Sequence, residues 1–179
     1  MTIIQAIPPR DVRTAFTQAA KRNEPFEERE GYDNDANRWG VDPEDRNFTG
    51  VMGEMALAVY ADLQIDSTIY DVGDGGIDFR VAYQGEERTI DVKTRTKDPF
   101  ALWVKEGSLR ADWYVLGHLR SPPDSDQLEG WSVELIGRAS KEELLDAEMS
   151  KSDYGHQNHS ILRKDLHPIP EPDDLVMAE

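Results

Sequence analysis

Asp91 and Lys93 stand two residues apart in the stretch RTIDVKTR, residues 88–95. In a strand this even offset places both charged side chains on one face and the apolar Ile90 and Val92 on the other. About one acid-x-Lys pattern is expected by chance in a chain this acidic, so the pair has meaning only through its placement. The chemistry it suggests depends on which further charges meet it.

Two further carboxylates are predicted to converge on this pair. Asp78 begins the alternating stretch 77–83, which a short turn joins to the strand of Asp91 as a hairpin. Glu54 lies on a predicted helix among small and apolar neighbours, where an ionised carboxylate is costly unless a cation or donors meet it. Glu54, Asp78 and Asp91 would form an all-oxygen cluster suited to Mg²⁺ or Mn²⁺, with Lys93 beside it.

Hydrophobic periodicity predicts the elements that position these residues. Apolar residues at helical spacing indicate helices over 10–22 and 47–63, and Ser140 followed by Glu143 is a capping box that opens a helix over 141–149. Strands are predicted over 77–83, 88–96, 101–106, 112–119 and 131–139. We therefore expect an α/β fold with a central mixed β-sheet and flanking helices.

The chain is expected to form one domain with three parts. Residues 1–46 would add an N-terminal helix and an acidic loop to the core, because residues 23–47 are dense in charge, glycine, proline and asparagine. The core would span 47–168. Residues 169–179 form an acidic, proline-rich tail that we expect to be poorly packed.

The 179 residues carry 36 acidic and 20 basic side chains, for a net charge of -16 spread along the chain. Such self-repulsion is tolerated when salt screens it, and at about 1 M salt the Debye length is only about 3 Å. The composition therefore predicts a salt-rich cytoplasm, as in halophilic archaea and their viruses, or else an ordinary acidic bacterial protein. An acidic surface also argues against a broad electrostatic grip on nucleic acid, although it allows a local site.

Cysteine is absent from the sequence, so a metal ion would be held by oxygen or imidazole ligands. We find neither a signal-like N-terminus nor an apolar run long enough for a bilayer, which predicts a soluble, cytoplasmic protein without a membrane partner. His156 and His159 are expected to be surface histidines, because glycine and asparagine beside them favour a loop.

The arrangement of these motifs resembles the PD-(D/E)XK nuclease superfamily. The resemblance rests on a helix with Gly53-Glu54, on GGID ending at Asp78, on a hairpin, on Asp91-Val92-Lys93 and on the apolar stretch DWYVLGHL, and it covers about residues 47–140. Gly76-Ile77 replaces the proline that the superfamily's name places before the first aspartate. The resemblance implies a restriction-endonuclease-like core.

That resemblance also implies a metal-dependent endonuclease that hydrolyses DNA in restriction, repair, recombination or viral genome processing. Asp78, Asp91 and the main-chain carbonyl of Val92 would hold Mg²⁺ or Mn²⁺, and Glu54 would bind the ion directly or through water. Lys93 would orient the attacking water or stabilise the phosphorane. Arg95 and Lys97 would contact flanking phosphates of the DNA. DNA is the expected partner, with a homodimer or viral proteins as further partners and a virion as a further location.

Three other interpretations stay open at this point. Lys93 could form a buried salt bridge with one acid while the other acids are exposed. The fold could serve without catalysis, as a virion or assembly scaffold. A sugar or nucleotide hydrolase with paired carboxylates fits less well, because the GDGG stretch at 73–76 lacks the lysine and hydroxyl residue of a phosphate-cradling loop.

Overall fold

The computed structural model describes residues 2–27, 43–65, 76–124, 127–151 and 157–178. A six-stranded sheet forms its centre, in the order β1-β6-β5-β3-β2-β9. These strands are β1 (Ile3–Ala6), β6 (Ser132–Ser140), β5 (Trp113–Arg120), β3 (Glu86–Arg95), β2 (Phe79–Tyr83) and β9 (Val176–Met177). The β3 and β5 strands run parallel, and the other pairs are antiparallel. The predicted α/β class and mixed sheet are confirmed.

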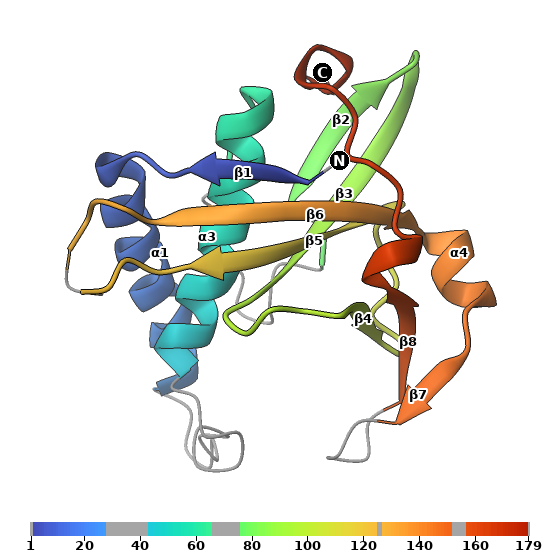
Figure 1. Ribbon diagram of the computed structural model, residues 1–179, viewed down its shortest axis with the longest axis horizontal. Coiled ribbons are helices and arrows are strands. Elements are labelled where there is room, and N and C mark those ends of the chain that lie inside the picture. The colour runs from blue at the N-terminus through green and yellow to red at the C-terminus, as the bar shows by residue number, and fades with distance from the viewer. Residues whose placement is uncertain (1, 28–42, 66–75, 125–126, 152–156, 179) are drawn as a thin grey trace.

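Two helices, α1 (Pro9–Glu27) and α3 (Pro43–Ala61), pack together on one face of the sheet (Figure 1). The buried stripe of α1 comes from side chains at helical spacing, among them Val12, Ala15 and Ala19. The α3 helix is apolar nearly all round and contacts β3, β5, β6 and β1. Its central position agrees with the prediction made from its sequence.

The opposite face of the sheet has a second, smaller core. A three-stranded sheet in the order β4-β8-β7 and the short helix α4 (Lys141–Asp146) contribute to it. Its strands are β4 (Ala101–Lys105), β8 (Gln157–Leu162) and β7 (Met149–Lys151). The capping box is present as predicted, because the Ser140 side chain accepts from the Glu143 N–H and the Glu143 carboxylate accepts from the Ser140 N–H.

Several boundaries differ from the sequence prediction. Helix α1 continues to Glu27 and α3 begins at Pro43, so the predicted loop is shorter at both ends, and residues 28–42 lie outside the described chain. The strand β1 was missed. The α4 helix ends at Asp146, earlier than predicted. Strand β7 begins at Met149, which was the last residue of the predicted helix.

The tail is better packed than predicted. After the 3-10 turn η1 (Arg163–Asp165), Ile169 is buried in the main core, and Leu175 is buried after the second turn η2 (Pro172–Asp174). Strand β9 then pairs with β2. The prediction failed because one apolar residue at a time is too weak a signal among prolines and acids. Within the described ranges, no helix combines the length and apolar character needed to cross a membrane.

Candidate metal-binding cleft

A cleft of about 960 Å³ opens where strand β3 loses its neighbour β2. The β2–β3 ladder ends at the pair Phe79–Ile90, whereas β3 continues beside β5 to Arg95. One edge of residues 91–95 is therefore left open to the cleft in the described part of the chain. Every residue predicted for the site lines this cleft: Glu54, Asp78, Asp91, Val92, Lys93, Arg95 and Lys97.

Helix α3 approaches β3 closely at Gly53. A Cβ atom at this position would lie 1.7 Å from Thr94 Oγ1 and 3.2 Å from Val92 Cγ1, so no residue larger than glycine fits without displacing the helix or the strand. This contact places the next residue, Glu54, beside β3 at the edge of the cleft. The Gly53-Glu54 pair thus has a packing explanation.

Glu54 is met by a cation that the sequence prediction missed. Its Oε1 and Oε2 accept hydrogen bonds from Nη1 and Nη2 of Arg22 at 2.7 and 2.8 Å. The Glu54 side chain is only 7% exposed and the Arg22 side chain 23%. A signal for Arg22 was available, because it continues the spacing of Val12, Ala15 and Ala19 on the buried stripe of α1.

Asp78 lies just before β2 and faces the open edge of β3. Its Oδ2 accepts a hydrogen bond from the main-chain N–H of Val92 at 2.6 Å. In a strand the N–H and C=O of one residue point to the same edge. The Val92 carbonyl is therefore directed toward the Asp78 side of the strand, where the sequence interpretation requires it.

Asp91 and Lys93 share the face of β3 that looks away from α3. Lys93 Nζ lies 2.6 Å from Asp91 Oδ2, and the Asp91 side chain is 3% exposed whereas that of Lys93 is 37% exposed. The predicted lysine-acid pair thus exists. The other two acids are not left exposed to solvent, since Glu54 is buried with Arg22 and Asp78 is partly buried.

The three carboxylates line one cleft but do not form one tight group. Among the described residues, the set of three ligating side chains whose atoms all lie within 4.8 Å of one another is Asp98, His118 and Glu134. Like charges repel, and these three carboxylates have different partners: Arg22 meets Glu54, the Val92 N–H meets Asp78 and Lys93 meets Asp91. Glu54 in particular has its own cation.

The cleft is locally far less acidic than the chain. Among the described residues, its lining holds five cations, Arg22, Arg46, Lys93, Arg95 and Lys97, against the four carboxylates Asp45, Glu54, Asp78 and Asp91. The guanidinium of Arg95 lies 4.8 Å from the ring centroid of Trp103 on β4, a cation–π contact. Three of these cations, Lys93, Arg95 and Lys97, lie on β3 or just after it.

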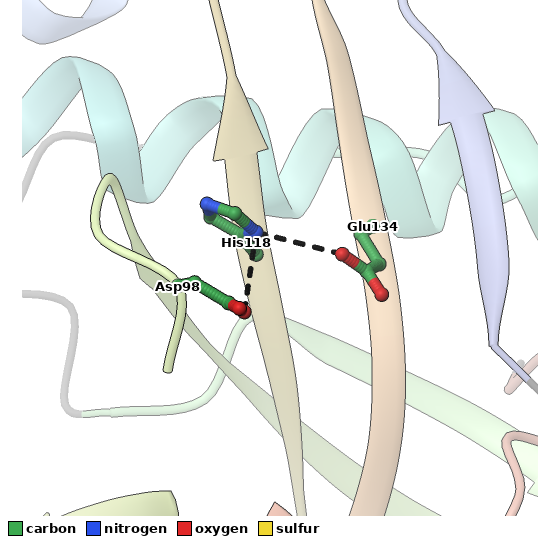
Figure 2. Close-up of side chains that lie close together, drawn as sticks. All are labelled: Asp98, His118 and Glu134. Carbon is green, nitrogen blue, oxygen red and sulfur yellow. Dashed lines mark ion pairs between the residues drawn. The ribbon is translucent and has the colours of Figure 1, made fainter. Parts of the chain in front are cut away.

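A second charged cluster lies on the same sheet face, next to Arg95. His118 on β5 is paired across the sheet with Arg95 and Glu134, and its Nδ1 lies 3.5 Å from Glu134 Oε2 and 3.7 Å from Asp98 Oδ1 (Figure 2). Residue types and spacing here are those of a metal site. Sequence reasoning missed it, because its members come from two strands and a loop.

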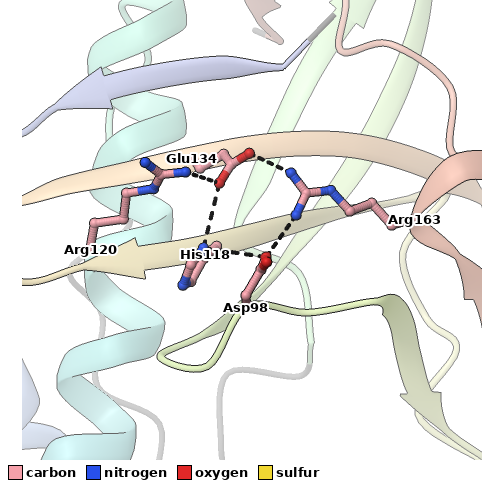
Figure 3. Close-up of polar contacts among 5 residues, drawn as sticks. All are labelled: Asp98, His118, Arg120, Glu134 and Arg163. Atoms are coloured by element: carbon pink, nitrogen blue, oxygen red, sulfur yellow. Dashed lines mark hydrogen bonds and ion pairs between the residues drawn. The ribbon is translucent and has the colours of Figure 1, made fainter.

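Two arginines already meet the acids of this cluster (Figure 3). Arg120 reaches Glu134 at 2.6 Å, and Arg163 bridges Glu134 at 2.5 Å and Asp98 at 2.7 Å. Burial alone would raise the pKa of Glu134, but the hydrogen bond from Arg120 and the charges of Arg163 and Arg120 outweigh it, so this pKa lies below its usual value. We interpret Asp98, His118, Arg120, Glu134 and Arg163 as a structural network, hereafter the arginine network.

The two histidines named in the sequence analysis, His156 and His159, have different outcomes. His159 is 8% exposed on β8, so its prediction as a surface histidine is wrong, because the loop expected there is a strand covered by the second core. His156 lies outside the described residues.

No known family model, curated protein or solved structure matches this chain.

Proposed function

We propose that the protein is a divalent-metal-dependent endonuclease that hydrolyses phosphodiester bonds of DNA, built on a restriction-endonuclease-like core of the PD-(D/E)XK type. One observation carries this proposal. The open edge of β3 places Asp78, Asp91 and Lys93 in a single cleft, and the described residues that line it include five cations against four carboxylates, in a chain of net charge -16. A local positive surface of this kind suits a polyanion.

Asp78, Asp91 and the Val92 carbonyl are the groups that would hold Mg²⁺ or Mn²⁺. Oxygen ligands fit these hard cations, and Asp91 and Asp78 come from separate elements that meet at the strand edge. When bound, the ion supplies a water of lowered pKa and neutralises charge on the scissile phosphate. Lys93 holds Asp91 in place and presents its ammonium group, partly exposed, to that phosphate.

Arg95, Lys97 and Arg46 would contact flanking phosphates of the DNA. All three are exposed and line the cleft. In a salt-rich cytoplasm, counterion release contributes little, so a few charge-assisted contacts near the cleft count for more than a wide basic surface. This explains how a strongly acidic protein could bind DNA at one place.

Cleavage of supercoiled and branched DNA in Mg²⁺ or Mn²⁺, at salt concentrations from low to molar, tests the proposal. The wild-type protein should nick or linearise the DNA, and Asp91→Ala and Asp78→Asn should abolish the reaction. Asp165→Asn is the matched control, because Asp165 is exposed in η1 and outside the cleft lining. Absence of metal-dependent cleavage of every DNA form by the folded wild-type protein would remove the enzymatic interpretation.

A non-catalytic scaffold, such as a virion or assembly component, is the second candidate. The observation in its favour is that Glu54, Asp78 and Asp91 each have a partner within the chain, as in a purely structural charge network. Calorimetric titration with Mn²⁺ separates the two candidates. Binding that is lost in Asp78→Asn supports the nuclease, whereas a wild-type protein that binds no Mn²⁺ supports the scaffold.

A further inference from the structure

Arg22 and Glu54 form the most fully satisfied ion pair of the cleft. Both oxygens of Glu54 accept from both terminal nitrogens of Arg22, and the pair joins α1 to α3. This two-bonded fork geometry is the strongest arrangement that an arginine and a carboxylate adopt. A cation that approached Glu54 would have to displace a partner that is already well oriented and largely buried.

The distances between the carboxylate oxygens also argue against one ion shared by Glu54 and both aspartates. Two oxygens that bind one Mg²⁺ at about 2.1 Å lie at most about 4.2 Å apart. The oxygens of Glu54, Asp78 and Asp91 do not all lie within 4.8 Å of one another, since among the described residues Asp98, His118 and Glu134 alone meet that criterion. In this arrangement Glu54 does not share one ion with both aspartates.

We infer that Arg22 is a built-in counter-cation which withdraws Glu54 from the metal, so that Glu54 acts as a positioning residue and Asp78 and Asp91 are the acidic ligands. This inference rests on the proposed metal site and deepens it. Arg22 cancels the charge of Glu54 at the edge of the cleft, which keeps metal affinity lower than three uncompensated carboxylates would give. It also fixes α1 against the helix that lies on β3.

The test is a double-substitution cycle on Mn²⁺ affinity, measured by calorimetry at one fixed salt concentration. In Arg22→Met the charge of Glu54 is uncompensated, and Mn²⁺ should bind about tenfold more tightly. In Arg22→Met/Glu54→Gln both charges are gone, and affinity should return to within about threefold of the wild type. Asp91→Asn should lose binding.

Arg13→Met is the matched control for charge. It removes one arginine from the same helix as Arg22, but Arg13 is exposed and outside the cleft lining, so it should change Mn²⁺ affinity by less than about threefold. Thermal unfolding checks each variant, and the double variant leaves no uncompensated buried charge, so it should fold even where Arg22→Met is weakened.

The outcomes are distinct. If the double variant loses tenfold or more in Mn²⁺ affinity, Glu54 is a direct ligand and the inference is overturned while the metal site stands. The inference is also overturned if Arg22→Met and Arg13→Met tighten binding equally. If the wild-type protein binds no Mn²⁺, the proposed metal site itself fails and the inference fails with it.

Discussion

The cleft at the edge of β3 and the arginine network lie on the same sheet and both bring acids and cations together, yet they differ in the strand pairing around their acids. Glu134 is held by two arginines between paired strands and is 7% exposed. Asp78, by contrast, meets a strand edge where pairing has ended, and Lys93 beside Asp91 is 37% exposed. Burial does not separate the two groups, because Asp91 is 3% exposed and Asp98 is 72% exposed. They differ in that the acids of the cleft border a strand edge that has no neighbouring strand in the described part of the chain.

Lys93→Met should give the largest effect. The substitution keeps the length of the side chain but removes the ammonium group, so cleavage should fall at least about 100-fold while Mn²⁺ affinity is retained or increases, because Asp91 loses a competing cation. Cleavage assays and Mn²⁺ titration on one preparation check both parts. Equal loss of cleavage in Lys105→Met, an exposed lysine at the end of β4, would contradict a specific role for Lys93.

Gly53→Ala should disrupt the cleft through packing. The new methyl group would overlap Thr94 Oγ1, so the helix must move away from β3, at a cost of about 1–3 kcal/mol in unfolding free energy. Chemical denaturation measures this loss. Gly50→Ala on the same helix is the control, since its Cβ meets nothing within 4 Å, and it should stabilise the protein by about 0.5–1 kcal/mol.

Glu134→Gln should weaken the fold and leave metal binding in the cleft unchanged. Loss of one partner of a buried charge pair costs about 3–5 kcal/mol, and about 2 kcal/mol is expected here because Arg120 and Arg163 keep access to water. Urea unfolding gives the stability and Mn²⁺ titration the affinity. A variant that is as stable as the wild type but has lost Mn²⁺ binding would reverse the assignment of the two regions.

The effect of Glu134→Gln should also depend on pH. The pKa of Glu134 in the folded protein lies below its usual value, so its ionised form stabilises the fold above about pH 4.3, the pKa of an unfolded glutamate, and this stability is lost as pH falls through the folded pKa. The difference in unfolding free energy between wild type and variant should therefore shrink toward zero on titration from pH 7 to pH 3. A difference that grows in acid would contradict the assignment.

The parts of this structure that the sequence predicted are those set by local pattern. The strand predicted over 88–96 and the capping box at Ser140 depend on neighbouring residues, and both are present, as β3 and at the start of α4. The gathering of Glu54, Asp78 and Asp91 in one cleft also agrees with expectation, whereas the coordination of an ion by Asp78 and Asp91 stays a prediction.

The parts that were missed depend on long-range contacts. Arg22 meets Glu54 across 32 positions of sequence, and its helical spacing was visible while its partner was not. Arg163 meets Glu134 across 29 positions, from the last stretch of the predicted core. Strand β9 is too short to show a period, and its pairing follows from the burial of Leu175 before it.

A crystal soaked in Mn²⁺ and measured for anomalous scattering tests the central claim most directly, because it compares the two acid clusters in one experiment. We predict one anomalous peak in the cleft, bound by Asp78 and Asp91, with Arg22 still on Glu54 and the arginine network intact. A peak among Asp98, His118 and Glu134, or none in the cleft at saturating Mn²⁺, would contradict this account.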